Sequence, residues 1–229
     1  WYSDKIVLRM YQARELSESE APMIYSMVRE LAANAQIPMP RIAVVPEEAP
    51  NAFATGRNPE NSVVAVTEGI LRLLSPEELK GVLAHEIAHI ANRDILIQTV
   101  AGVMASTIVS IANFMQFAAI FGMGRSSEDG EGGGSNPLMP IAASLIQFAI
   151  SRSREYLADA SGARYCGQPL ALAAALGKLQ SWNQRIPMQN GNPTTAEMFI
   201  VAPLFGGGMA KLFSTHPDIN DRIARLREM

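Results

Sequence analysis

Two histidines and a glutamate lie close together in the sequence. His85 and His89 are four residues apart, and Glu86 directly follows His85. On a helix, residues i and i+4 project from nearly the same side, so both imidazoles can bind one metal ion. Glu86 lies about 100° around the helix from His85. It can therefore reach a water molecule at that metal without being a ligand itself.

This spacing is the H-E-x-x-H pattern of zinc-dependent peptidases. It predicts one Zn²⁺ per chain, which lowers the pKa of a water molecule toward about 7. Glu86 would then act as the general base, taking a proton from the attacking water and passing it to the leaving amine. The competing interpretation is a pair of surface histidines on an ordinary helix.

A capped helix must carry the motif. Ser75 suits the N-cap position, Pro76 the first helical position, and Glu78 can complete a capping box. We expect this helix to run at least to Asn92. Further helices are expected at 17–36 (capped by Ser17 or Ser19), 152–165, 169–182 and 217–227, and strands at 41–46, 51–55 and 62–67.

Two uncharged stretches predict a membrane hairpin. Ile95 to Gly124 contains no charged residue, and a second apolar stretch runs from Leu138 to Ser151. A membrane helix needs roughly 20 residues. The alternative is a buried helical hairpin in a soluble core, because several Gln and Asn residues interrupt the stretches and the mean hydropathy of the chain is only +0.08.

Charge placement gives the hairpin a direction. Of 19 Lys and Arg residues, nine precede Ile95, nine follow Ser151, and only Arg125 lies in the polar connecting loop, 125–136. By the positive-inside rule the loop is external and the rest of the chain is cytoplasmic.

A zinc site of this kind needs a third protein ligand. The only other histidine, His216, is far away in the sequence, and the only cysteine, Cys166, is expected in a loop, so a carboxylate is favoured. If the hairpin arms are antiparallel, Glu155 returns close to His89, with Asp159 one turn further on to hold a ligand histidine. The alternative for Glu155 is an ion pair with Arg152 or Arg154 on a solvated face.

The same residues carry a family resemblance. Glu77–Asp94 (EELKGVLAHEIAHIANRD), the hairpin and Ser153–Gly162 (SREYLADASG) together resemble the HtpX-type membrane metallopeptidases. Asn51–Gly56 (NAFATG) and Ser214–Pro217 (STHP) match that family in order and position. The resemblance covers essentially the whole chain.

The resemblance implies an α+β, zincin-like (gluzincin) fold that is mostly helical, with a small sheet and a two-helix transmembrane hairpin inserted. It implies that His85, His89 and Glu155 bind zinc and that Glu86 is the base. It also implies a multi-pass protein of the bacterial inner membrane whose active site faces the cytoplasm and serves the stress response. Family members usually have two further N-terminal membrane helices. Because the chain begins at Trp1, we expect that an N-terminal part of the natural protein is missing.

Two further roles follow only from the resemblance. In zinc peptidases, an edge strand beside the metal pairs with extended substrate through main-chain hydrogen bonds. The resemblance implies that this strand consists here of Asn51, Ala52, Phe53, Ala54 and Thr55. His216 would stabilise the oxyanion formed when water attacks the peptide carbonyl. Its alternative role is to cap the last helix.

The chain is therefore expected to divide into 1–94, the hairpin 95–151 and 152–229, the outer two forming one catalytic unit. The expected function is a zinc metalloendopeptidase acting on misfolded or misassembled membrane proteins in the lipid bilayer. The rivals are a soluble zinc aminopeptidase and a catalytically silent membrane adaptor. A net charge of −3 without a basic stripe argues against nucleic acid, and a single cysteine fits a reducing compartment. The oligomeric state is left open.

Overall fold

The computed structural model of the chain describes residues 3–120, 138–183, 185, 199–201 and 217–229. Its elements, in chain order, are α1 (Ser3–Met10), β1 (Arg14–Glu15), α2 (Pro22–Asn34), β2 (Arg41–Val45), β3 (Ala52–Gly56), the 3-10 turn η1 (Pro59–Asn61), β4 (Ser62–Thr67), α3 (Glu68–Leu73), α4 (Pro76–Ala91), α5 (Asp94–Ile120), α6 (Leu138–Cys166), α7 (Pro169–Asn183) and α8 (Ile219–Arg227).

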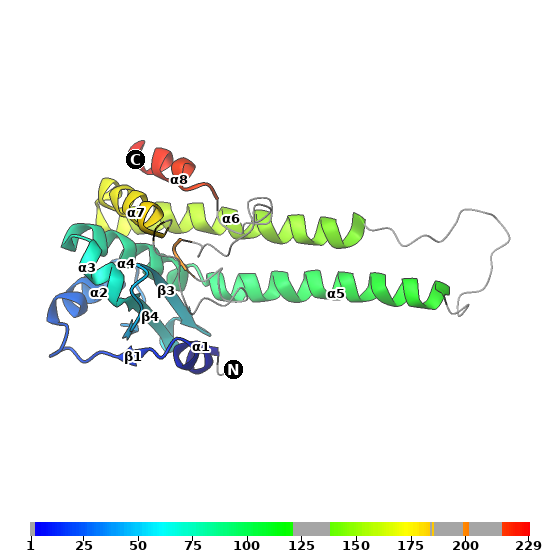
Figure 1. Cartoon of the computed structure of the whole chain (residues 1–229), viewed down its shortest axis with the longest axis horizontal. Coiled ribbons are helices and arrows are strands. Elements are labelled where there is room, and N and C mark those ends of the chain that lie inside the picture. The colour runs from blue at the N-terminus through cyan, green and yellow to red at the C-terminus, as the bar shows by residue number, and fades with distance from the viewer. Residues whose placement is uncertain (1–2, 121–137, 184, 186–198, 202–216) are drawn as a thin grey trace.

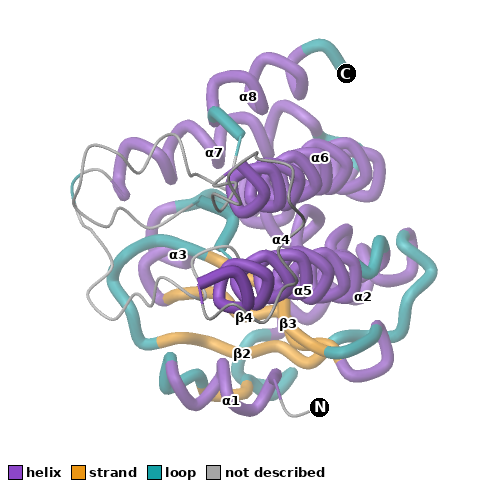
Figure 2. The backbone as a smooth tube through the Cα atoms, turned by 90° about the vertical axis from the view of Figure 1, so that its right-hand side faces the viewer, coloured by secondary structure: helices purple, strands orange, loops and turns teal. Residues whose placement is uncertain are grey.

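A four-stranded sheet forms one layer, in the order β1-β2-β4-β3. β2 and β4 are parallel, and the outer strands pair antiparallel to them. Every residue of β3 and β4 is buried, because α1 covers one face of the sheet and the other helices cover the opposite face (Figure 2). Burial on both faces explains why β4, from Val63 to Val66, is a continuous run of valine and alanine without alternating polar residues.

α4 is the central helix of the layer of helices that covers the face of the sheet opposite α1, and it packs against α2, α6, α7 and β3. It starts with the expected capping box: the Ser75 side chain accepts from the Glu78 main chain, and the Glu78 side chain accepts from the Ser75 main chain. This reciprocal bonding satisfies donors that the first helical turn otherwise leaves unpaired. The start of the helix, and with it the direction in which its side chains project, is thereby fixed.

The hairpin extends from this body as two long helices lying side by side, α5 and α6 (Figure 1). Within the described residues, one helix is long and apolar enough to cross a membrane: Asp94–Met115 of α5, 22 residues with a mean hydropathy of 1.9. Beyond Asp94, which is buried at the base of the helix, no side chain of this stretch whose burial is described is buried. α6 does not meet the same test, since its apolar part begins at Leu138 and charged residues start at Arg152.

Several expected boundaries differ from those in the structure. Ser17 and Ser19 do not cap α2, which begins at Pro22 after Ala21; Ser17 instead bonds Glu20. The hairpin arm ending near Ser151 and the helix expected at 152–165 are one continuous helix, because no Gly or Pro separates them. The short elements α1, β1 and α3 were not expected. The loop 125–136 lies outside the described residues.

The segments before and after the hairpin share one hydrophobic core. Its buried members come from α2, the sheet and α4 on one side of the hairpin in sequence, and from α6, α7 and α8 on the other. Formation of this core brings residues more than 60 positions apart in the sequence into contact around α4. This packing places Glu155, the expected third ligand, opposite His85 and His89.

Candidate metal centre

His85 and His89 project from α4 toward one point. Their Nε2 atoms are 3.0 Å apart, and the two rings are nearly perpendicular. The His85 side chain is fully buried, and that of His89 is 14% exposed. At this distance the two Nε2 atoms can share a proton when one of them carries it, and they can equally face one metal ion.

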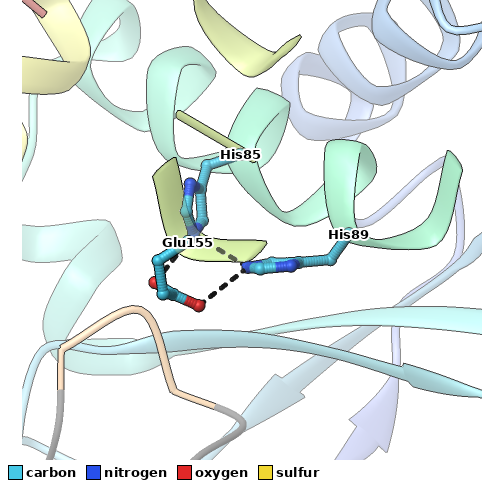
Figure 3. Close-up of side chains that lie close together, drawn as sticks. All are labelled: His85, His89 and Glu155. Carbon is cyan, nitrogen blue, oxygen red and sulfur yellow. Dashed lines mark hydrogen bonds and ion pairs between the residues drawn. The ribbon is translucent and has the colours of Figure 1, made fainter. Parts of the chain in front are cut away.

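Glu155 of α6 faces the two histidines (Figure 3). Its Oε1 is 3.4 Å from His89 Nε2, and its Oε2 is 3.7 Å from His85 Nε2. One ligand atom from each of these three residues lies within 4.8 Å of the others. Two imidazoles and one carboxylate are a set that zinc accepts from proteins, with a fourth position left for water or substrate. The residues therefore fit a zinc ion.

Asp159, one turn beyond Glu155, holds His85. The His85 Nδ1 is 2.9 Å from Asp159 Oδ1. With Nδ1–H donating to the carboxylate, the lone pair is on Nε2, the atom that faces the other ligands. This contact supports the predicted role of Asp159 in orienting His85, which stays a prediction.

Arg222 of α8 in turn holds Asp159. Its Nε and Nη2 donate to the two carboxylate oxygens at 2.8 and 2.7 Å. Nη1 donates to the main-chain oxygen of Ile200 at 3.0 Å and lies 3.1 Å from Glu155 Oε2. The whole arginine is buried. A buried cation here offsets the two carboxylates at the site and fixes both of them.

His89 has a partner of its own in Asp94, the first residue of α5. The His89 Nδ1 is 2.7 Å from Asp94 Oδ2. Asp94 is buried and forms an ion pair with Arg154 of α6. Each histidine is thus oriented by an aspartate, and each aspartate is held by an arginine.

Glu86 is buried beside these ligands. Neither of its carboxylate oxygens has a hydrogen-bond partner with normal geometry in the described part of the chain. Burial raises the pKa of Glu86 to about 8, and nearby Glu155 adds to the rise, while His89 and the Ala54 main-chain N–H favour the charged form. Burying a carboxylate without a hydrogen-bond partner destabilises the fold. Such a cost is expected where the carboxylate serves in proton transfer.

The two histidines titrate in opposite directions. Burial, reinforced by the neighbouring His89, lowers the pKa of His85 to about 4. Burial also acts to lower the pKa of His89, but the Glu155 carboxylate outweighs it and the pKa is raised. For Asp159, burial opposes ionisation, but Arg222 prevails and lowers the pKa to about 2. At neutral pH His85 is therefore a neutral imidazole and Asp159 is an anion.

β3 is one of the two edge strands of the sheet and borders α4. Its outer edge is partly occupied: the Ile200 N–H donates to the Ala52 oxygen at 3.1 Å, and Phe53 forms a β-bridge with Phe199. The Asn51 side chain bonds the Val201 oxygen at 2.9 Å. Because outward groups alternate along a strand, the Ala54 main-chain groups face the same outer edge. Thr55 lies further along the same buried strand.

The remaining candidates lie elsewhere. His216 falls outside the described residues. Cys166 is the last residue of α6, and its thiol contacts the Ala163 main-chain oxygen. It is not part of the ligand group. Asp94 and Arg222 were missed as site residues. Asp94 ends the segment Glu77–Asp94, five residues after His89. That spacing does not predict a contact with His89 unless the turn between α4 and α5 is known. In the sequence, nothing distinguishes Arg222 from the other arginines of the polar terminal helix.

Comparisons with known proteins agree with the geometry. The model of peptidase family M48 matches residues 18–229. A protein named "Protease HtpX homolog" from Syntrophobacter fumaroxidans is 56% identical, covering 100% of this chain and 84% of its own. A protein of the same name from Pyrococcus furiosus is 54% identical, covering 100% and 81%.

A solved structure shares the fold. The crystal structure of S. mikatae Ste24p superposes with a TM-score of 0.60 at 20% identity, covering 98% of this chain. This chain spans about half of Ste24p, 56% of its length. The α+β zincin-like fold and the HtpX-type resemblance are thereby confirmed, and the findings support a membrane-associated protein. The chain belongs to peptidase family M48, and it is a metalloprotease of the HtpX type.

Proposed function

We propose that this chain is a zinc-dependent endopeptidase of the bacterial inner membrane that cuts misfolded or misassembled membrane proteins. The observation that carries the proposal is the position of Glu86, buried and without a hydrogen-bond partner in the described residues, beside the group His85, His89 and Glu155. A general base must be within hydrogen-bond reach of the reacting water, and an oxygen without a partner is available to accept its proton.

The chain's own residues would divide the work as follows. His85, His89 and Glu155 would hold one zinc ion, whose chemistry is that of a Lewis acid toward the peptide carbonyl and the attacking water. Glu86 would accept the proton of that water on a carboxylate oxygen and deliver it to the amine that leaves. Asp159 and Arg222 would keep the imidazole of His85 in its ligating orientation.

Substrate would add to the outer edge of β3. Ala54 lies on the outward side of that strand, and its N–H is close enough to Glu86 to favour the charged carboxylate. An extended peptide paired there would place its carbonyl between Glu86 and the metal ligands. Pairing through main-chain groups suits a protease of unfolded segments, because it does not depend on side-chain identity. His216 remains the predicted oxyanion stabiliser.

The membrane assignment rests on α5 and on charge. α5 has the length and composition of a spanning helix. All Lys and Arg residues except Arg125 lie before Ile95 or after Ser151, outside the hairpin. We propose that the hairpin crosses the membrane with its loop outside and the catalytic body in the cytoplasm. Substrates emerging from the bilayer would then meet the site close to the membrane surface.

The test is proteolysis of an unfolded protein by the purified chain in detergent. Cleavage that stops with a chelator and returns with zinc supports the zinc endopeptidase. Release of single N-terminal residues would favour the aminopeptidase instead. A protein that binds zinc but cleaves nothing would favour the adaptor.

A further inference from the structure

We propose that Asp94 and Arg154 form a positioning pair that ties the orientation of His89 to the packing of the two hairpin stems. The inference rests on the proposed zinc site. It concerns residues to which the proposed mechanism gives no part.

A tight turn makes the contact possible. α4 ends at Ala91, Asn92 caps it, and Arg93 adopts a positive φ of 56° before α5 begins at Asp94. A non-glycine residue with φ near +60° reverses the chain within very few residues at some cost in strain. The turn brings the Asp94 carboxylate back against the last turn of α4. There its Oδ2 is 2.7 Å from His89 Nδ1.

The second half of the pair comes from the opposite stem. The Arg154 Nη2 bonds Asp94 Oδ1, and it also donates to the main-chain oxygen of Asn92 at 3.0 Å. One guanidinium therefore fastens both the carboxylate and the turn that presents it. Asp94 is 2% exposed and Arg154 is 15% exposed, so water screens this pair little.

The location of the pair gives it a consequence for the metal. Asp94 opens α5 and Arg154 lies in α6, where the two stems of the hairpin meet the catalytic body (Figure 1). Any separation of the stems would pull Arg154 away from Asp94. Asp94 would then lose the group that aims it at His89. The ring of His89 would become free to rotate, and the site would hold its metal less tightly.

The pair mirrors the buried set on the other histidine. Asp159 and Arg222 orient His85 from inside the body, whereas Asp94 and Arg154 orient His89 from the hairpin base. Only the second set includes a residue of the helix that qualifies as a membrane span. α5 thus reaches the site through His89, by way of Asp94.

The experiment is a zinc titration against a competing chelator, using the full chain in detergent. The proteins are wild type, Asp94→Asn, Arg154→Gln and the double variant. Outer partners of ligand histidines typically contribute about 10- to 100-fold in metal affinity. We expect a loss in that range for Asp94→Asn and a smaller loss for Arg154→Gln. The double variant should match Asp94→Asn alone, because Arg154 acts through Asp94.

Two further measurements separate positioning from general stability. The visible spectrum of bound Co²⁺ should change in Asp94→Asn, since it reports ligand geometry. Lys178→Gln is the control: it breaks an ion pair between α7 and Glu78 of α4, away from the metal. Its zinc affinity and Co²⁺ spectrum should match those of wild type, whatever happens to its melting temperature.

The outcomes distinguish the two claims. If wild type binds zinc and Asp94→Asn binds it equally well with an unchanged Co²⁺ spectrum, the positioning pair is refuted. If Arg154→Gln still weakens zinc binding in the Asp94→Asn background, the arginine acts on its neighbour Glu155, and the proposed route is wrong. If wild type binds no zinc, the proposed function fails before this inference is reached.

Discussion

Gly162 of α6 lies against the backbone of His85. A Cβ built on Gly162 would be 2.9 Å from the His85 nitrogen and 3.0 Å from the Ala84 carbonyl carbon. Backbone atoms cannot move aside as a flexible side chain would. The close crossing of α6 over α4 brings Glu155 and Asp159 within reach of the histidines.

Gly162→Ala should therefore damage both the fold and the site. Overpacking of this kind costs about 1–3 kcal/mol, more than the gain of roughly 1 kcal/mol from replacing a helical glycine with alanine. We expect a lower melting temperature for the metal-free protein and weaker zinc binding. Gly177→Ala in α7 is the control, because among the residues that the structure describes its Cβ would meet only Ile223 Cδ1, at 3.8 Å. That variant should be at least as stable as wild type; equal stability of both variants would refute the close-crossing argument.

Arg222→Met should destabilise the protein strongly. The substitution leaves Asp159 and Glu155 buried without their shared cation, and breaking a buried ion pair costs about 3–5 kcal/mol. The exposed Arg227 on the same helix provides a control, since Arg227→Gln should stay within about 0.5 kcal/mol of wild type. Chemical unfolding measures both. Similar midpoints for the two variants would show that Arg222 is not needed to offset the carboxylates.

Glu155→Gln should lose zinc more completely than Asp159→Asn. The first removes an anionic ligand, whereas the second weakens a partner of His85 and should cost about 10- to 100-fold in affinity. Zinc titrations followed through thermal unfolding give both affinities, because a ligand bound only by the folded state raises the melting temperature. Glu155→Gln holding zinc as tightly as wild type would assign the third ligand elsewhere.

The proposed topology is open to labelling with an impermeant thiol reagent in intact cells. The native thiol is first removed by Cys166→Ala. A cysteine at Ser135, in the connecting loop, should react from outside, and one at Glu60 should react only after the membrane is opened. Glu60 is chosen because it is exposed, whereas the nearby Ser62 is buried in β4. The reverse pattern would overturn the orientation.

Much of the site was readable from local spacing. His85 and His89 share a helix face by arithmetic alone, and the capping signals at Ser75 and Glu78 locate the start of that helix. The β-branched run of β4 likewise marks a strand without reference to the rest of the chain. These features depend on residues within a few positions of one another.

The parts that were missed depend on contacts across the chain. Arg222 reaches Asp159 over 63 positions, and nothing in the helix around it marks one arginine as buried. The pairing of Ile200 with Ala52 closes part of the edge strand from a distant segment. Asp94 is near His89 in sequence, but its role depends on the positive φ of Arg93. Such relationships follow from tertiary packing, which local pattern does not encode.

The central claim is that Glu86 moves the proton while the other three residues hold the metal. The most direct measurement compares wild type with Glu86→Gln for zinc content and for cleavage of an unfolded protein under the same conditions. The account predicts that Glu86→Gln retains zinc and loses cleavage by about a hundredfold or more. Near-normal cleavage by the zinc-loaded variant would contradict it.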